Sequence, residues 1–229
     1  MNWELIVKWL PRLAEGAWLT LELVGIAVIA GLILAIPLGI ARASRHWWLR
    51  ALPYAYIFFF RGTPLLVQLF LVYYGLAQFE AVREGPLWPY LRDAYWCAIV
   101  TLTLHTAAYI AEILRGAIQA IPPGEIEAAR ALGMARWQTL LYIVLPRAAR
   151  IGLPAYSNEV ILMLKASALA STITLLELTG MSRTIIARTY QPVEIFFAAG
   201  LFYLVAAYLL VQCFRLLERR LRVDACQGR

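Results

Sequence analysis

The residues best able to do chemistry are polar side chains inside an apolar segment, residues 151–175. Asn158 and Glu159 are adjacent there, and Lys165 follows. A carboxylate at the middle of a membrane costs roughly 2.5–3.5 kcal/mol, so such residues usually face a cavity or a partner. A carboxylate in a wet cavity favours a cationic ligand through Coulomb attraction. The sequence therefore makes Asn158 and Glu159 candidates for a site that binds a positively charged substrate.

An ion pair within the protein is the alternative role for Glu159. Lys165 is a poor partner, because at 100° per residue it lies about 120° round a helix from Glu159. Asn158 and Lys165 are seven positions apart and share a helical face. We therefore expect Lys165 to meet the outer interface or a partner subunit, and Glu159 to meet the substrate or a cation on another helix.

Signatures of enzyme chemistry are missing from the sequence. It has no GxxxxGK[ST] phosphate-binding loop, no GxSxG nucleophile elbow and no paired His or Cys ligands. His105 is expected to pack or to hydrogen-bond another helix rather than to bind a metal. We expect no catalytic residue, metal or cofactor in this chain, and any ATP that it uses would be hydrolysed by another chain.

The composition is that of an integral membrane protein. Of 229 residues, 62% are hydrophobic and 15% are charged, against about 25% charged in soluble domains. The net charge is +7, but the arginines lie between apolar runs rather than on one basic face, which argues against nucleic acid as a partner. Five apolar stretches are long enough to cross a bilayer as helices, and we predict one all-α transmembrane domain over 1–229 with spans at 17–41, 52–79, 94–120, 151–175 and 195–217.

Two of these spans carry further charged residues. Arg61 comes just before Pro64, which marks a break or bend in the second span. Because a buried arginine is costly, Arg61 either reaches the nearer surface or pairs inside the bundle. Glu112 and Arg115 are three apart on one face of the third span and are expected to pair. Arg61, Glu112 and Lys165 are candidates for structural or gating roles.

The distribution of Arg and Lys predicts the orientation. The flanks 42–50, 115–150 and 215–229 hold thirteen arginines, whereas the opposite flanks hold six Lys or Arg. Cytoplasmic loops carry the excess of positive charge. This rule puts the loop between the third and fourth spans and the C-terminus in the cytoplasm, and the N-terminus on the outer side of the membrane.

That loop, residues 121–146, is the longest polar segment between apolar runs. It opens after two prolines and a glycine and closes at Pro146. Gly133 separates a first helical piece from a second piece at 135–144. A short helix needs tertiary packing to persist, so the apolar side of the first piece is expected to lie on the protein's own spans or in a partner's groove. That side consists of Ile126, Ala129, Leu132 and Met134.

Seven loop positions at fixed spacing resemble the EAA loop of the membrane subunits of bacterial ABC importers. They are Glu127, Ala128, Ala129, Gly133, Ile143, Leu145 and Pro146. The stretch FFFRGTPLLVQLF resembles the polar amino acid branch of these permeases. The stretch LPAYSNEVILMLKASALAS resembles histidine, arginine and opine permeases. The resemblance implies a type I importer fold with a cytoplasmic coupling helix, and a basic amino acid substrate for which Glu159 is the counter-charge.

The resemblance also implies partners and a location. The partners are two ATPase subunits, a second permease subunit that is identical or paralogous, and a periplasmic amino acid-binding protein. The location is the bacterial inner membrane. The implied substrate is arginine, ornithine or histidine, with an opine or another polar amino acid as the alternative. Two other classes stay open, an ATP-independent carrier and a non-transporting scaffold. Carriers commonly show inverted repeats, and the sequence shows no repeat.

Overall fold

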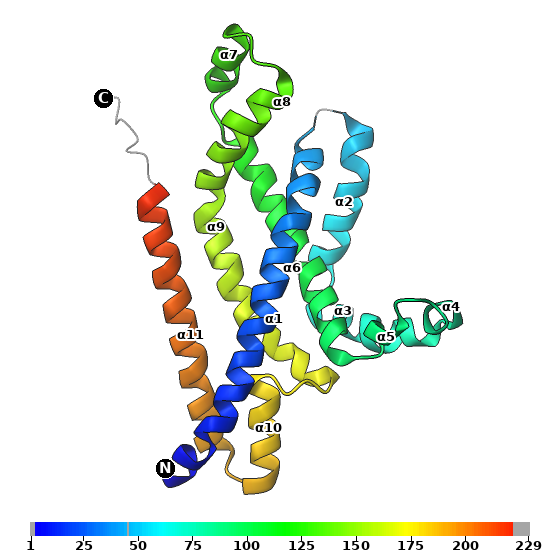
Figure 1. Cartoon of the computed structure of the whole chain (residues 1–229), viewed down its shortest axis with the longest axis vertical. Helices are drawn as coiled ribbons and strands as arrows, with labels where there is room; N and C mark the ends of the chain where they lie inside the picture. The colour runs from blue at the N-terminus through cyan, green and yellow to red at the C-terminus, as the bar shows by residue number, and fades with distance from the viewer. Residues whose placement is uncertain (1–2, 45, 222–229) are drawn as a thin grey trace.

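A computed structural model describes residues 3–44 and 46–221, and the described residues are almost entirely helical. Arg45, Arg222 and Arg229, which contributed to the predicted orientation, lie outside the described residues, as do both chain termini. The helices form one elongated bundle, with α7 and α8 at one end and α10 at the other (Figure 1). Their bounds are α1 Trp3–Ala43, α2 Trp47–Gly62, α3 Leu65–Phe70, α4 Glu80–Arg83, α5 Trp88–Leu91, α6 Ala94–Gln119, α7 Pro123–Ala131, α8 Arg136–Thr139, α9 Leu145–Ala166, α10 Leu178–Thr189 and α11 Pro192–Leu221.

Three helices, α1, α6 and α11, are long and apolar enough to cross a membrane by themselves. Two bent pairs bring the number of candidate spans to five if each pair is one span. Helix α6 occupies residues 94–119, where the sequence predicts a span at 94–120, and α11 occupies residues 192–221, where it predicts a span at 195–217. The first helix is much longer than the predicted range of 17–41, because α1 continues without interruption to Trp3 through Pro11.

The predicted second span, 52–79, is not one straight helix. It bends by 104° between α2 and the helical residues 65–78. Thr63, which precedes Pro64, has an extended backbone with ψ of 143°, as proline requires of the residue before it. The Gln68 side chain is buried and its Nε2 donates to the carbonyl oxygens of Phe60 at 2.8 Å and Thr63 at 3.0 Å. The amide satisfies carbonyls that the bend leaves free, and so it fixes the end of α2 where Arg61 lies.

The helix does not break at Pro146, where the sequence predicts that the polar loop closes. Residues 136–173 form one continuous helical segment that runs through Pro146. A proline inside a helix lacks an amide donor and collides with the carbonyl four residues earlier. Here a π-helical turn, Leu140–Val144, precedes Leu145-Pro146, and its wider hydrogen-bond spacing makes room for the ring. The fourth span therefore extends directly into the coupling loop, while at its other end the helix tightens to a 3₁₀ turn at Ser167–Ile173.

The core lies between α1, α6 and α9. Leu23, Leu102 and Met163 are among its most buried side chains, one from each helix. Gly31 of α1 lies directly against α6, where an added Cβ would come within 3.1 Å of the Thr106 side chain. Small residues at this contact let the two helix backbones approach closely, which is the usual basis of helix association in membranes.

At the end opposite the coupling loop, Glu177 joins three helices. Its carboxylate accepts hydrogen bonds from the amides of Thr179 and Gly180, both at 2.9 Å, and from the Tyr203 hydroxyl at 3.0 Å. The Thr20 hydroxyl lies 3.4 Å away and accepts the Leu178 amide at 3.1 Å. The carboxylate thus caps α10, where the helix dipole favours negative charge, and ties α10 to α1 and α11.

Candidate functional site

A polar stripe runs along one side of α6. His105, Tyr109 and Glu112 are four and three positions apart, so they share one face of the helix. All three are partly exposed, whereas Ala107 and Ala111 on the other side are buried. The stripe is therefore the side of α6 that the protein's own core leaves uncovered.

Arg61 approaches this stripe from the end of α2. Its guanidinium carbon lies 5.1 Å from the centroid of the Tyr109 ring, in range for a cation–π interaction. Arg61 also interacts electrostatically with Glu112 and Glu159. No ion pair of Arg61 within 4 Å is present in the described part of the chain. Arg61 is exposed, so of the two roles expected for it the structure shows a guanidinium at the surface of the bundle that also contacts the Tyr109 ring.

The three polar residues predicted on the fourth span point in different directions. Glu159 is only 7% exposed, whereas Asn158 and Lys165 are exposed. This separation follows from the helical angles, since Asn158 and Lys165 share a face and Glu159 does not. Within residues 3–44 and 46–221, Glu159 has no hydrogen bond or ion pair and interacts electrostatically with Arg61. Glu159 is thus buried within electrostatic range of Arg61 but not paired with it, and Asn158 and Lys165 lie on the outer side of α9.

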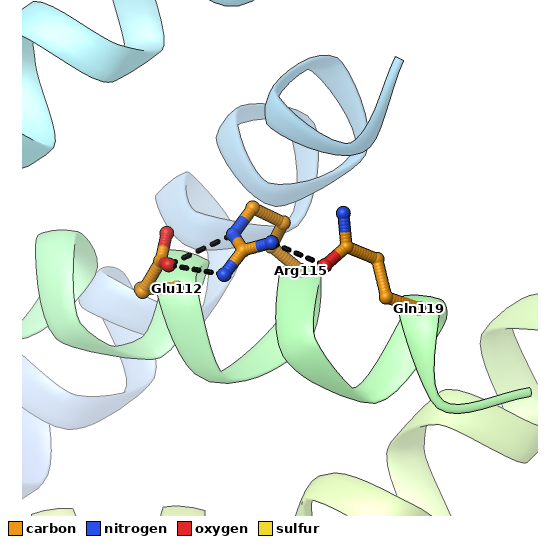
Figure 2. A network of polar contacts seen from close by, with 3 residues as sticks. All are labelled: Glu112, Arg115 and Gln119. Atoms are coloured by element: carbon orange, nitrogen blue, oxygen red, sulfur yellow. Dashed lines mark hydrogen bonds and ion pairs between the residues drawn. The ribbon is translucent and has the colours of Figure 1, made fainter. Parts of the chain in front are cut away.

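Glu112 and Arg115 form the predicted ion pair. Arg115 Nη2 lies 2.6 Å from Glu112 Oε1, and Arg115 Nε donates to the same oxygen at 2.8 Å. Arg115 Nη1 also donates to Gln119, one turn further along α6 (Figure 2). The second oxygen of Glu112 is buried without a hydrogen-bond partner. Glu112 thus keeps one oxygen free beside a cavity of about 290 Å³ that Arg42 and Arg61 also line.

His105 is hydrogen-bonded to another helix, as expected from the sequence. Its Nδ1 lies 2.9 Å from Oε1 of Gln68 on α3. Gln68 therefore connects the bend after α2 with the polar stripe on α6. No group of three or more His, Cys, Asp or Glu suited to a metal is found among the described residues.

In the coupling loop, residues 121–146, part of the apolar side is buried against the protein and part is exposed. Ala129 is 4% exposed, and Ile126 packs on a cluster that includes Ala117 and Val144. Leu132 is 83% exposed, and Glu127 and Ala128 on α7 are exposed as well. Part of α7 is thus held by the protein's own spans, and part of it is open to a partner.

A glycine and an ion pair set the position of α7. Gly133 has φ of +79°, a conformation that side-chain-bearing residues rarely adopt. Glu125 on α7 lies 3.1 Å from Nη2 of Arg147 in the first turn of α9. Ile143 and Leu145 are partly buried and Pro146 is exposed. The loop is therefore joined to the fourth span both by backbone continuity and by this ion pair.

Sequence reasoning did not single out Gln68, Arg42 or Glu177, and it assigned Tyr109 to packing rather than to contact with a ligand. A signal for Tyr109 existed, because polar residues at positions 105, 109 and 112 repeat at helical spacing inside an apolar helix. Glu177 gave no such signal, since its partners Thr20 and Tyr203 are distant in sequence and only the fold brings them together.

Comparisons with known proteins agree with this architecture. The family model described as "Binding-protein-dependent transport system inner membrane component" matches residues 27–223. The octopine transport system permease protein OccM of Rhizobium meliloti is 50% identical over 94% of this chain and 86% of its own length. The nopaline permease NocM of Agrobacterium fabrum is 44% identical over 95% and 91%. The histidine/lysine/arginine/ornithine permease HisM of Escherichia coli is 44% identical over 90% and 87%.

Solved structures show the same fold. A crystal structure of an amino acid ABC transporter with histidines superposes with a TM-score of 0.85 at 34% identity, covering 96% of this chain and 99% of that one. The MetNI methionine transporter superposes with a TM-score of 0.78 at 22% identity, covering 94% and 99%, which shows the fold alone. The fold is thus that of a type I ABC importer permease.

The family resolves the main questions that the sequence left open. Its members are transport subunits rather than enzymes, ATP is hydrolysed by a separate subunit, and they work with ATPase and substrate-binding partners in the inner membrane. An ATP-independent carrier is therefore excluded. This chain belongs to the family of binding-protein-dependent transport system inner membrane components, as a polar amino acid permease of an ABC importer.

Proposed function

We propose that the substrate is a cationic amino acid or an opine built on one, and that a guanidinium is the group recognised. Arginine, octopine and nopaline all carry a guanidinium. The names of the similar permeases include octopine, nopaline and arginine. Ornithine and histidine, the other substrates expected from the sequence, carry a cation of different shape and are second candidates.

The observation that carries the proposal is the environment of the Arg61 guanidinium. It stacks on Tyr109 and interacts electrostatically with Glu159 and Glu112. An aromatic face and carboxylates are the groups that bind a planar cation best. The surroundings that suit the guanidinium of Arg61 also suit that of a substrate, with Glu159 as its counter-charge. Asn158 lies on the outer face of α9 and contributes a polar group to the passage between the two permeases.

The proposal includes the direction of coupling. The N-terminus is periplasmic, and the coupling loop and C-terminus are cytoplasmic, as the arginine distribution predicts. Glu127, Ala128 and Leu132 on the open side of α7 dock on the ATPase. Movement of α7 then reaches Glu159 through the Glu125–Arg147 ion pair and the continuous helix from Arg136 to Ala166. ATP drives the change only because it binds one conformation better than the other.

The complete importer contains two ATPase subunits, two permeases and a periplasmic binding protein. The exposed face with Asn158 and Lys165 is the side that a second permease, paralogous or identical, covers. Polar side chains are costly against lipid, so a passage or a subunit contact is the favourable place for this face.

The test is uptake by the complete importer in proteoliposomes with internal ATP. Octopine, arginine, ornithine and histidine are compared with an uncharged amino acid in the presence of the binding protein. We expect ATP-dependent uptake of the guanidinium compounds and little uptake of the uncharged one. Equal uptake of the uncharged amino acid would overturn the proposed selectivity, and binding of the ATPase without any uptake would favour the scaffold role.

A further inference from the structure

Two arginines line one cavity between α1, α2 and α6. The cavity measures about 290 Å³, and Arg42 from the last turn of α1 and Arg61 from the last turn of α2 are in its walls. Arg42 is partly exposed and Arg61 is exposed. Neither has an ion pair within 4 Å in the part of the chain that the structure describes. Charged side chains without a partner are costly in a membrane bundle, and they usually mark a site for a ligand or another subunit.

An aromatic ring holds each of the two guanidiniums. The guanidinium carbon of Arg42 lies 4.9 Å from the centroid of the Tyr54 ring, and that of Arg61 lies 5.1 Å from the Tyr109 ring. A ring covers one face of the planar guanidinium, whereas the N–H donors point outward in its plane. The buried nitrogen of Arg42 is Nε, so a ligand in the cavity would reach Arg42 through its terminal nitrogens. Both arginines are therefore held in place without using up the donors that bind a carboxylate.

Glu112 adds one negative charge to the wall of the same cavity. Its Oε1 accepts from Arg115, as Figure 2 shows. Glu112 also interacts electrostatically with Arg42 and Arg61. The cavity thus presents two positive groups and one negative group. This arrangement is complementary to a ligand with two carboxylates and one ammonium, because each charge of the ligand then has an opposite charge nearby.

We propose that this cavity binds the dicarboxylate end of an opine. The inference rests on the proposed function, which includes opines among the substrates. Octopine is an arginine whose α-nitrogen carries a carboxyethyl group, so two carboxylates flank one secondary ammonium, whereas arginine itself has a single carboxylate. Arginine side chains bind carboxylates by paired, charge-assisted hydrogen bonds. Arg42 and Arg61 each take one carboxylate, and the ammonium lies on the side of Glu112.

The two arginines have different roles in this arrangement. Arg61 lines the cavity and also interacts electrostatically with Glu159, the proposed counter-charge of the substrate. We assign to Arg61 the carboxylate that arginine and octopine have in common. The second carboxylate, which only the opine has, falls to Arg42. Arg42 is thus the residue that distinguishes an opine from a simple amino acid.

A lipid phosphate or an acidic residue of the second permease could also meet two arginines. Either group would bring negative charge toward Glu112 without a positive charge to offset it, and like charges repel. The polar stripe of α6 that contains Tyr109 and Glu112 is also unfavourable against lipid. The ammonium of an opine removes this conflict, so the arrangement favours the substrate.

The test is uptake of octopine and arginine by the complete importer in proteoliposomes with internal ATP. The same binding protein delivers both substrates, so the octopine-to-arginine ratio of a variant relative to the wild type reports on the permease. Arg42→Gln should lower octopine uptake about tenfold more than arginine uptake, because one charge-assisted contact is lost. Arg61→Gln should lower both. Arg50→Gln removes a charge from an exposed position on α2 that does not line the cavity, and it should leave the ratio unchanged.

An unchanged ratio in Arg42→Gln would overturn the proposal. If Arg42 instead holds a lipid or the second permease, uptake of both substrates falls equally, and the ratio stays constant. Tyr54→Leu keeps both arginines and removes the ring under Arg42, and it should lower the ratio about threefold, as loss of a cation–π contact does. This second variant keeps the proposal testable if Arg42→Gln does not assemble.

Ornithine and the opine built on ornithine separate this inference from the proposed function. They differ from each other by the same second carboxylate, but neither has a guanidinium. If guanidinium recognition is wrong, this pair is taken up as well as arginine and octopine, and Arg42→Gln still lowers the opine-to-amino-acid ratio. If the inference is wrong, Arg42→Gln leaves the ratio unchanged in both pairs, whichever cation is preferred.

Discussion

Glu159 and Glu177 are both buried carboxylates, but their surroundings differ. Glu177 is 0% exposed and accepts hydrogen bonds from two backbone amides and a tyrosine hydroxyl. Glu159 is 7% exposed, and in the described part of the chain its interaction is the electrostatic one with Arg61. A buried polar group that the fold needs is usually satisfied by the fold. Under the proposed function, the difference separates a carboxylate that builds the protein from one that is available to a ligand.

Removing Glu177 should have the largest effect. Glu177→Ala leaves the amides of Thr179 and Gly180 and the Tyr203 hydroxyl without their acceptor, inside a membrane bundle. We expect a loss on the order of 3–5 kcal/mol of stability, because several buried donors lose their partner together. The measurement is thermal unfolding in detergent, together with the yield of folded protein.

The control for Glu177→Ala is Tyr203→Phe, which removes one hydrogen-bond donor to Glu177 and keeps the carboxylate that caps α10. It should be clearly less destabilising than Glu177→Ala. If Glu177→Ala unfolds at the same temperature as the wild type, the distinction between the two carboxylates fails.

In contrast to Glu177→Ala, which should lower stability, Glu159→Gln should lower transport and leave stability nearly unchanged. The amide keeps the shape of the side chain and removes the charge that attracts a cation. We expect uptake of guanidinium substrates to fall on the order of 10- to 100-fold through loss of one close charge pair, with the melting temperature nearly unchanged. Unchanged arginine and octopine uptake at normal expression would remove Glu159 from the substrate site.

The sequence made the general architecture predictable but not these contacts. The apolar runs, the break at Pro64 and the pairing of Glu112 with Arg115 follow from local rules of length, proline geometry and helical spacing. Glu177 could not be found in this way, because a lone glutamate in a polar connection looks like an ordinary surface residue. Its role depends on Thr20 and Tyr203, which only the packing of α1 and α11 brings near.

The helix that continues through Pro146 was missed for a different reason. Proline usually ends a helix, and the rule was applied without the π-helical turn at Leu140–Val144 that accommodates the ring. Such a turn has no sequence signature in this chain that we recognise. The candidate substrate site could not be fully predicted from the sequence for a similar reason. The approach of Arg61 to Tyr109 depends on the 104° bend after α2, and residue spacing alone does not predict that angle.

Helix α7 also contains one carboxylate with a partner in the protein and one without. Glu125 is paired with Arg147, whereas Glu127, two positions later, is exposed and has no ion pair among the described residues. Glu127→Ala should therefore leave stability unchanged and weaken binding of the ATPase about 3- to 10-fold, as loss of one interfacial charge does. Co-purification of the ATPase and substrate-stimulated ATP hydrolysis measure this effect. Full coupling in the variant would show that the open side of α7 is not the docking surface.

Glu125→Gln should give the smallest effect, because it breaks an ion pair that is partly exposed. The side chains of Arg147 and Glu125 are 42% and 33% exposed, and such pairs contribute about 0.2–1 kcal/mol. We expect a small fall in melting temperature that added salt diminishes, since screening already weakens the pair in the wild type. If the pair also transmits movement from α7 to α9, ATP hydrolysis should persist while uptake per ATP falls, and Glu125→Asp should restore part of it. A loss of ATPase binding instead would place Glu125 on the docking surface with Glu127 and remove the contrast between them.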